Sequence, residues 1–338
     1  MQKPRTILVV EYVTGGGLVT EALSPSLLGE GSTMLGALLE DFATCEDFEL
    51  IVFRDARLPI PALASVASWV TIGPDSCFET ELSRVAQQVD AVWLIAPETG
   101  GALERLSMQI ETLGVKLLSV PSLAVRTAAN KLMTHDLMLQ HEIPVVPTRT
   151  WLVSDPPLDA SSHFVVKPND GVGCEGVYRF DSIPDPWPTA LNRGDLIIQP
   201  WIEGISRSLS GLFCDGKATL LSCNTQVLHQ KDHSIYLSGC IVNSVQDHDA
   251  RYQQLLDRIA KALPSLWGYA GIAFIEAEDQ LWVVEINPRL TSSYAGLRQA
   301  TGINLAEAVI QLWQNGSLAN LRKSCHYSIP LNLIPEQL

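Results

Sequence analysis

Short apolar runs alternate with helix-like amphipathic stretches through the first third of the chain. Parallel strands need long, usually helical connections, so this alternation predicts βαβ units in a small doubly wound α/β domain over residues 1–120. Thr14–Gly17 and Pro97–Gly101 would be loops at strand ends, where such folds bind ligands. The expected strands are Thr6–Val13, Glu49–Phe53, Ala91–Ile95 and Lys116–Ser119, and the expected helices are Ser32–Phe42, Cys77–Gln88 and Leu103–Leu113.

Helical spacing of apolar residues resumes from about Pro121 to Gln140, until Pro144 forces a stop. We therefore expect one long helix, followed by extended chain at Ile143–Pro147. Proline-rich stretches at Ser154–Ser162 and Asp181–Pro188 are typical of linkers, and a small strand-rich piece lies between them. Together these features suggest a second unit over residues 121–200.

The last third of the chain changes character and consists mainly of strands. Runs of mostly antiparallel strands crossed by a helix predict an α+β unit over residues 201–338, packed against the first domain. The expected strands are Ile197–Trp201, Ser208–Cys214, Ala218–Cys223, Ile235–Asn243, Gly271–Glu276 and Leu281–Ile286, with a helix at Asp249–Leu263. The fold class is therefore α/β combined with α+β.

Composition narrows the classes of function. The 338 residues are 46% hydrophobic and carry a net charge of −14, and the absence of a basic stripe argues against nucleic-acid binding. No apolar run approaches a membrane span, and the apolar run after the N-terminus is too short for a signal-peptide core. Seven cysteines without a CxxC pair favour neither a disulfide framework nor a thiolate zinc site, so a cytoplasmic protein is expected.

Residues 164–176, FVVKPNDGVGCEG, combine an apolar strand carrying Lys167 with a glycine-rich loop. Backbone N–H groups of such a loop can close over a triphosphate, while the lysine neutralises phosphate charge. Gly171, Gly173 and Gly176 also match the GxGxxG dinucleotide fingerprint, but that motif must open a helix, and the residues that follow are β-like. A plain glycine-rich hairpin turn is the remaining alternative.

Residues 281–289, LWVVEINPR, end a buried strand with a carboxylate and an amide. Side chains alternate along a strand, so Glu285 and Asn287 share one face. This pair suits Mg²⁺, a hard cation that completes its coordination with water and phosphate oxygens. Arg289 could then direct its guanidinium at a phosphate or carboxylate. A simple strand-end turn is the structural alternative.

Two further segments are not informative alone, and they support a function only through their position relative to the other motifs. Lys131 lies on the expected long helix, where a solvated lysine would be ordinary. Residues 198–204, IQPWIEG, read as a strand that turns outward at a proline, where backbone groups could meet an adenine edge and Glu203 a ribose.

The order of lysine helix, lysine with glycine loop, hinge and acidic ExN strand over residues 121–297 resembles the ATP-grasp superfamily. The resemblance implies a pre-ATP-grasp domain over 1–120, a lid subdomain with its leading helix over 121–200, and a C-terminal subdomain over 201–338. It implies ATP and Mg²⁺ as cofactors, with Mn²⁺ as a substitute for magnesium. Lys131 and Lys167 would contact the nucleotide phosphates, and Glu285 and Asn287 would bind the metal. Further ATP-binding residues would be Gly171, Gly173 and Gly176 in the lid and Gln199, Pro200, Trp201, Ile202 and Glu203 around the adenosine.

One position departs from the family pattern. Most members carry a second acidic metal ligand in the preceding strand, where this chain has Ala273. Glu276 is the nearest carboxylate, but three residues on it faces the other side of a regular strand unless a bulge re-aims it. An inactive nucleotide-binding sensor or scaffold therefore remains an alternative function.

EYVTGGG at 11–17, CNTQ at 223–226 and NPRLTSSYAGL at 287–297 resemble a narrower carboligase-like branch, which includes ligases joining glutamate to tyramine in methanofuran biosynthesis. The branch implies a carboxylate–amine ligase that forms an amide through an acyl phosphate, with glutamate and tyramine or tyrosine as candidate substrates. Lys167 and Arg289 would stabilise the charge that develops during transfer. The candidate substrate-binding residues are Tyr12, Thr14, Gly15, Gly16, Arg207, Asn224, Gln226, Ser292, Ser293 and Tyr294, the last of which could equally be a core aromatic.

Two alternatives stay open at this point. A bicarbonate-dependent ATP-grasp carboxylase is the alternative within the family, and a homodimer is one candidate assembly. His229 and His233 are expected in a loop rather than in a metal site, and Cys174 is expected to be a small loop residue rather than a nucleophile.

Overall fold

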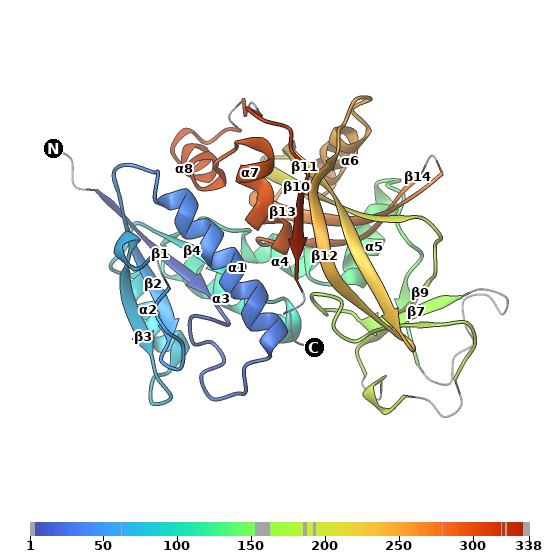
Figure 1. Cartoon of the computed structure of the whole chain (residues 1–338), viewed down its shortest axis with the longest axis horizontal. Helices are drawn as coiled ribbons and strands as arrows, with labels where there is room; N and C mark the ends of the chain where they lie inside the picture. The colour runs from blue at the N-terminus through green and yellow to red at the C-terminus, as the bar shows by residue number, and fades with distance from the viewer. Residues whose placement is uncertain are drawn as a thin grey trace.

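The computed structural model describes residues 4–61, 63–152, 163–184, 188–191, 194–278, 280–318, 320–321 and 323–333. The expected linker at 154–162 lies outside these residues, as do three residues of the one at 181–188. Figure 1 shows a parallel sheet with its helices beside a larger, strongly twisted sheet. The predicted combination of α/β and α+β parts is confirmed.

The first sheet has five parallel strands in the order β3-β2-β1-β4-β5. All five residues of β4 are buried, as is most of β1, which explains their continuous apolar runs. The strands are β1 Arg5–Glu11, β2 Phe48–Asp55, β3 Ser68–Ile72, β4 Ala91–Ile95 and β5 Lys116–Leu117. Three α-helices connect them: α1 Pro25–Phe42, α2 Phe78–Ala86 and α3 Ala102–Thr112, with short 3₁₀ turns η1 Ala64–Val66 and η2 Thr99–Gly101.

Two elements of this domain differ from the prediction. Helix α1 begins at Pro25 instead of Ser32, because Ser24 and Pro25 start the helix and the glycines that follow are tolerated within it. Edge strand β3 was not predicted at all.

The single helix expected over 121–140 is wrong, because the chain breaks there into two helices. Helix α4 covers Ser122–Ala128 and helix α5 covers Lys131–Gln140. Asn130 is the N-cap of α5, and its side chain accepts a hydrogen bond from the Met133 N–H at 3.0 Å. The break places Lys131 at the first position of a helix, facing the glycine loop.

The second sheet has ten strands, nine of them in the order β14-β13-β10-β11-β12-β8-β7-β9-β6, with β15 paired to β12. Its strands are β6 Arg149–Thr150, β7 Phe164–Pro168, β8 Val177–Phe180, β9 Leu196–Pro200, β10 Ile205–Cys214, β11 Lys217–Lys231, β12 Ser234–Val245, β13 Gly268–Ala277, β14 Gln280–Asn287 and β15 Ile329–Asn332. The other elements are η3 Thr189–Leu191, α6 Arg251–Ala262, η4 Ser292–Gly296, α7 Leu297–Thr301 and α8 Leu305–Asn315.

Strands β11 and β12 form a hairpin much longer than the two strands predicted there. His229 therefore lies within β11 and His233 in the turn, which corrects the expected loop position of His229. Among the described residues, two ladder pairs, Ser234↔Tyr178 and Ile235↔Val177, join this hairpin to β8, and the Arg179 N–H donates to the His233 carbonyl oxygen at 2.8 Å. The small β6–β9 part is thus attached to the rest of the larger sheet by a short edge.

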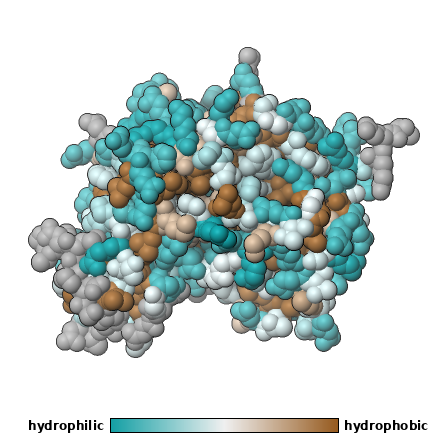
Figure 2. All heavy atoms as spheres, turned by 180° about the vertical axis from the view of Figure 1, so that it is seen from behind, coloured by the Kyte–Doolittle hydropathy of each residue, from teal (hydrophilic) through white to brown (hydrophobic). Residues whose placement is uncertain are grey.

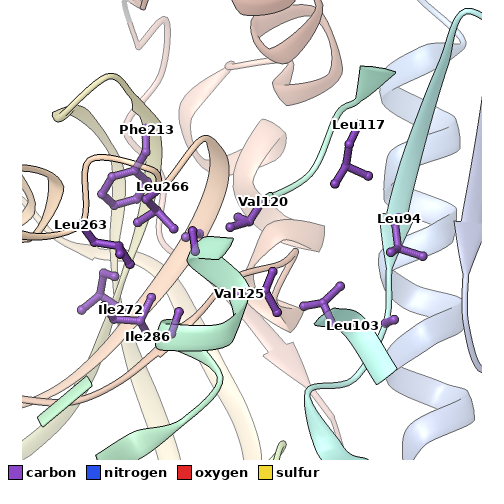
Figure 3. Close-up of a cluster of buried hydrophobic side chains, with 14 of the residues drawn as sticks. Leu94, Leu103, Leu117, Val120, Val125, Phe213, Leu263, Leu266, Ile272 and Ile286 are labelled. Atoms are coloured by element: carbon purple, nitrogen blue, oxygen red, sulfur yellow. The ribbon is translucent and has the colours of Figure 1, made fainter. Parts of the chain in front are cut away.

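Side chains from both sheets share one apolar core. Figure 3 shows Leu94 and Leu103 on one side of α4, Val125 on α4, and Ile272 and Ile286 on the other side. This continuous packing holds the first domain against the face that carries the ExN strand.

The face seen in Figure 2 is mostly hydrophilic, with scattered apolar groups. Within the part of the chain that the structure describes, no helix has the length and apolar character needed to cross a membrane.

Candidate active site

A cleft of about 870 Å³ lies between the small β6–β9 part and strands β13 and β14. It combines basic, acidic and apolar side chains drawn from segments far apart in the sequence. The predicted ATP-binding or metal-binding residues that line it are Lys131, Lys167, Gly171, Gln199, Pro200, Trp201, Ile202 and Glu285. The four-part sequence pattern therefore converges on one cleft.

Lys131 is held at the base of the glycine loop. Its Nζ lies 3.3 Å from Glu285 Oε2 and donates to the Gly171 carbonyl oxygen at 2.8 Å. Asn169 ties the loop to the start of α5, because its side-chain oxygen accepts from the Leu132 N–H at 3.1 Å. The lysine is 6% exposed, so it is a site residue and not the solvated lysine of the alternative interpretation.

Lys167 reaches the same cleft from β7 and is also 6% exposed. Burial lowers its pKa to about 8, despite the opposing effect of Glu285. For Glu285, burial acts to raise the pKa, but the charges of Lys131 and Lys167 hold it below its usual range. Two cations around one carboxylate leave an excess of positive charge, which suits a polyphosphate.

The far end of the cleft is built from β9 and the residues after it. Gln199 is 4% exposed and donates to Thr148 Oγ1 at 2.8 Å, which fixes this wall. The Trp201 indole N–H donates to Glu203 Oε1 at 2.8 Å, while the Arg179 guanidinium lies 4.7 Å from the Trp201 ring centroid. Glu203 stands beside the cleft lining, where it orients Trp201.

The glycine loop itself needs unusual backbone conformations. Gly173 and Gly176 have φ of +60° and +71°, so side chains there would be strained. Gly173 lines a second cavity, and a Cβ at this position would lie 3.3 Å from Glu30 Oε1. Gly176 closes the loop against Pro168.

The second cavity, of about 610 Å³, continues from the first and shares Cys174, Gln226 and Glu285 with it. Glu285, Asn287 and Arg289 all line it. The pairing of β13 with β14 shifts register between Ala273 and Phe274, leaving Val284 as the extra residue, and Val284 and Glu285 both face the first cleft. The bulge is therefore in β14, where it aims the ExN carboxylate.

These residues fit a magnesium ion that is held mainly by nucleotide phosphates. Glu285 and Asn287 offer one carboxylate and one amide oxygen, ligands that Mg²⁺ accepts. Within the described residues, no group of three or more histidine, cysteine or acidic side chains could hold a metal ion. A metal here would therefore need phosphate oxygens of the nucleotide as further ligands. Ala273 lies directly opposite Glu285 across the strand pair, so the missing acid leaves space at the metal position.

Glu276 does not fill that space. Ala273 and Ile275 line the first cleft, so Glu276 faces the opposite side of β13. There its carboxylate pairs with Arg207 and Arg251 and accepts a hydrogen bond from the Tyr252 hydroxyl at 2.8 Å. Side chains also alternate along β10, where Ser206 and Ser208 line the cavities. Arg207 between them therefore faces the opposite side of the sheet. The roles considered for Glu276 and Arg207 are therefore corrected.

Arg289 lies at the far end of the second cavity and is 9% exposed. Its Nε donates to Glu98 Oε2 at 2.8 Å, and its Nη1 donates to the Leu290 carbonyl oxygen at 3.0 Å. Burial opposes its charge, but Glu98 raises its pKa above the usual value. Ser292 and Ser293 line the same cavity, and the Ser292 hydroxyl donates to Glu30 Oε2 at 3.2 Å.

Other predicted substrate residues lie behind the site. Tyr294 is 2% exposed, and its hydroxyl donates to Asp41 Oδ2 at 2.7 Å, so it is the core aromatic of the alternative interpretation. Asn224 is fully buried and donates to Ser208 and Ser210, both at 3.3 Å. Gln226 does line both cavities and accepts from the Ser206 hydroxyl at 2.8 Å.

Four predicted substrate residues in the turn after β1 pack into the first domain. Thr14 is fully buried, Gly15 has no room for a side chain beside the Glu11 carbonyl, and Gly16 abuts Ile72. Tyr12 packs edge-on against Phe78. The residues of this region that line a cavity are instead Glu11 and Val13.

Sequence reasoning missed Glu11, Glu30 and Glu98. Glu30 was placed before the expected start of the first helix, so its position on α1 was not visible. Glu98 lies in the predicted loop after β4, and a carboxylate at a strand end was the available signal.

Comparisons with known proteins agree with this geometry. A family model described as an ATP-grasp domain matches residues 128–293, and one described as a pre ATP-grasp 3 domain matches residues 48–125. A tyramine–L-glutamate ligase of Methanocaldococcus fervens is 26% identical over 315 residues, covering 92% of this chain and 95% of the relative.

Two solved structures share the fold. An ATP-grasp superfamily protein from Archaeoglobus fulgidus superposes with a TM-score of 0.70 at 23% identity, over 94% of this chain and 90% of its own. The biotin carboxylase domain dimer of Hydrogenobacter thermophilus 2-oxoglutarate carboxylase, solved with Mg-ADP and bicarbonate, superposes with a TM-score of 0.71 at 15% identity, over 96% and 72%.

Proposed function

Since this chain belongs to the ATP-grasp superfamily and is an ATP-grasp ligase, we propose that it joins the carboxylate of glutamate to a primary amine, tyramine or tyrosine, in the biosynthesis of a methanofuran-type cofactor. The observation that carries the proposal is the convergence of Lys131, Lys167 and Glu285 on one cleft that opens into the Arg289 cavity. The named activity of the tyramine–L-glutamate ligase supports the choice of substrates.

The residues divide the reaction between the two cavities. ATP lies in the larger cleft, with its adenine beside Gln199–Ile202 and its phosphates near Lys131, Lys167 and the glycine loop. Glu285 and Asn287 would hold Mg²⁺, or Mn²⁺ as a substitute, and the bound metal would supply neutralisation of phosphate charge. The glutamate carboxylate lies near Arg289, where it attacks the γ-phosphate to give an acyl phosphate and ADP. Lys167 and Arg289 stabilise charge on the transferring group.

The fold similarity to a bicarbonate-binding carboxylase domain makes carboxylation the second candidate. Release of ADP separates the two: glutamate with tyramine should drive it, while bicarbonate with the same amine should not. The reverse pattern would assign the carboxylase function.

A direct test of the metal position is Glu285→Ala. Loss of the carboxylate should lower turnover by about 100-fold or more, because a charge-stabilising group is removed from the reacting phosphates. Exposed Glu46→Ala is the matched control and should keep full activity.

If the parent protein shows no turnover with any acceptor, the sensor or scaffold alternative is favoured. Analytical ultracentrifugation of the parent protein would test the proposed homodimer.

A further inference from the structure

A third cavity, of about 340 Å³, lies between α1 and the ends of β1 and β4. Most of the lining is apolar, from Val13, Leu27, Met34, Ile95, Ala96, Pro97 and Val172. The polar side chains among its lining residues are those of Glu11, Glu30 and Arg289.

Glu30 and Arg289 are the residues that this cavity shares with the Glu285–Asn287 cavity. They therefore mark the junction between an apolar pocket and the place where the acyl phosphate would form. A ligand in the apolar pocket would present its polar end at this junction, next to the Ser292 hydroxyl that donates to Glu30.

The charges at the junction favour a cation. Arg289 is paired with Glu98, at 2.8 Å between Nε and Oε2, whereas Glu30 has no salt bridge within the described residues. Glu11 is a second carboxyl group, and burial raises its pKa. It accepts from the Thr14 N–H at 2.7 Å and lies against Gly31, where a Cβ would approach within 2.6 Å. An apolar cavity with the Glu30 carboxylate at one end suits an ammonium group that carries an apolar body.

We propose that this cavity is the amine-binding site and that Glu30 is the proton acceptor of amide formation. The inference rests on the proposed ligase function. The bound ammonium first gives one proton to the Glu30 carboxylate. The neutral amine then uses its lone pair to form the C–N bond, and the C–O bond of the acyl phosphate breaks with its electron pair leaving on phosphate, which takes up the second N–H proton. The apolar lining selects arylalkyl or alkyl amines over ammonia.

The glycine loop links this site to ATP. Val172 of the loop lines the amine cavity, and Gly173 lies beside Glu30. The loop that covers the phosphates thus also completes the amine pocket.

The test separates the two half-reactions. Hydroxylamine is small and neutral near pH 7, so it can trap an acyl phosphate as a hydroxamate without the amine pocket. Glu30→Gln should keep ATP- and glutamate-dependent hydroxamate formation while lowering kcat for tyramine by about 100-fold or more, the usual contribution of a general base. Glutamine can still accept from Ser292, and Glu40→Gln on the same helix is the matched control.

A second pair of variants tests the apolar pocket without touching the carboxylate. Leu27→Ala should raise KM for tyramine by about ten-fold with little change in kcat, because apolar contact is lost. Leu28→Ala, on the same helix but outside the lining, should leave KM unchanged.

Unchanged tyramine turnover in Glu30→Gln would overturn the role of Glu30, and equal KM values in the two leucine variants would overturn the pocket. Failure of the parent protein to form any hydroxamate from glutamate would instead overturn the proposed function. The two failures are therefore distinguishable.

Discussion

Two lysines of the nucleotide cleft are equally buried but differ in their surroundings. Lys131 has Glu285 at 3.3 Å, whereas no ion pair is found for Lys167 within the described residues, and burial lowers its pKa to about 8. The cost of keeping Lys167 charged is therefore offset only when an anion arrives. This difference makes Lys167 the residue through which ATP binding should depend on pH.

We predict that ATP affinity falls as pH rises above about 8. The folded-state pKa lies below the usual 10.5, so free protein loses the Lys167 proton from about pH 8 upward, and binding a polyphosphate must take a proton up again. Calorimetry in buffers of different ionisation enthalpy would measure this uptake. Lys167→Arg stays charged and should abolish the dependence. A dissociation constant that is constant from pH 7 to 9.5 in the parent protein would contradict the assignment.

Ala273 offers a second prediction at the scale of one residue. Because it is paired with Glu285 across the sheet and lines the same cleft, Ala273→Asp should place a second carboxylate at the metal position. We expect Mn²⁺ affinity, measured by paramagnetic resonance in the presence of ADP, to rise by about ten-fold as ligand charge increases. Ala277→Asp, farther along the strand, is the control. Equal Mn²⁺ affinities of Ala273→Asp and the parent protein would show that the metal does not bind beside Ala273.

At the scale of elements, α1 is joined to the segment after the ExN strand by a buried hydrogen bond between Tyr294 and Asp41. Asp41 also accepts from the Leu305 N–H at 3.2 Å and lies 3.4 Å from Arg298. One carboxylate on α1 thereby fixes η4, α7 and the start of α8. Since Glu30 is on the same helix, this contact sets the position of the proposed amine site.

Tyr294→Phe should therefore destabilise the protein without weakening ATP binding. Loss of one hydrogen bond to a buried carboxylate costs about 1–2 kcal/mol in unfolding free energy, measured in urea. The ATP dissociation constant should not change, because Tyr294 does not line the cleft. Tyr327→Phe, at a position 62% exposed, is the control. A large loss of ATP affinity in Tyr294→Phe would show instead that Tyr294 takes part in ATP binding.

The sequence predicted elements best where the spacing of apolar residues agrees with the residues that begin or end an element. Strand β4 was predicted with its observed bounds, since its apolar run is short, follows Asp90 and is soon ended by Pro97. The break between α4 and α5 was missed because apolar spacing runs through it, and only the N-cap preference of Asn130 marks it. The start of α1 was missed because Gly29 and Gly31, ahead of the expected start at Ser32, hid the Ser-Pro signal.

At the scale of the whole molecule, most of the residues predicted for the nucleotide site line one cleft, whereas most of those predicted for the substrates do not line it or the adjoining cavity. Lys131, Lys167 and Glu285 belong to segments whose order carries the pattern, so their convergence followed from it. Arg207 was misplaced because its strand alternates toward Ser206 and Ser208, a pattern that was visible but not applied. Glu30 depends on the packing of two domains, for which no local signal exists.

The same packing predicts that the glycine loop closes against the first domain as well as over ATP. Asp170 of the loop accepts from the Gly100 N–H at 2.8 Å, and its carbonyl accepts from the Thr99 hydroxyl at 3.3 Å. Asp170→Ala should weaken the contact between the glycine loop and the first domain by about 0.5–1.5 kcal/mol, the net value of one hydrogen bond. Faster hydrogen exchange over residues 169–176 and a several-fold higher KM for ATP should follow, with unfolding free energy unchanged. Asp75→Ala, at an exposed position of the same domain, should have no effect, and unaltered exchange in Asp170→Ala would show that the loop is held by its own backbone.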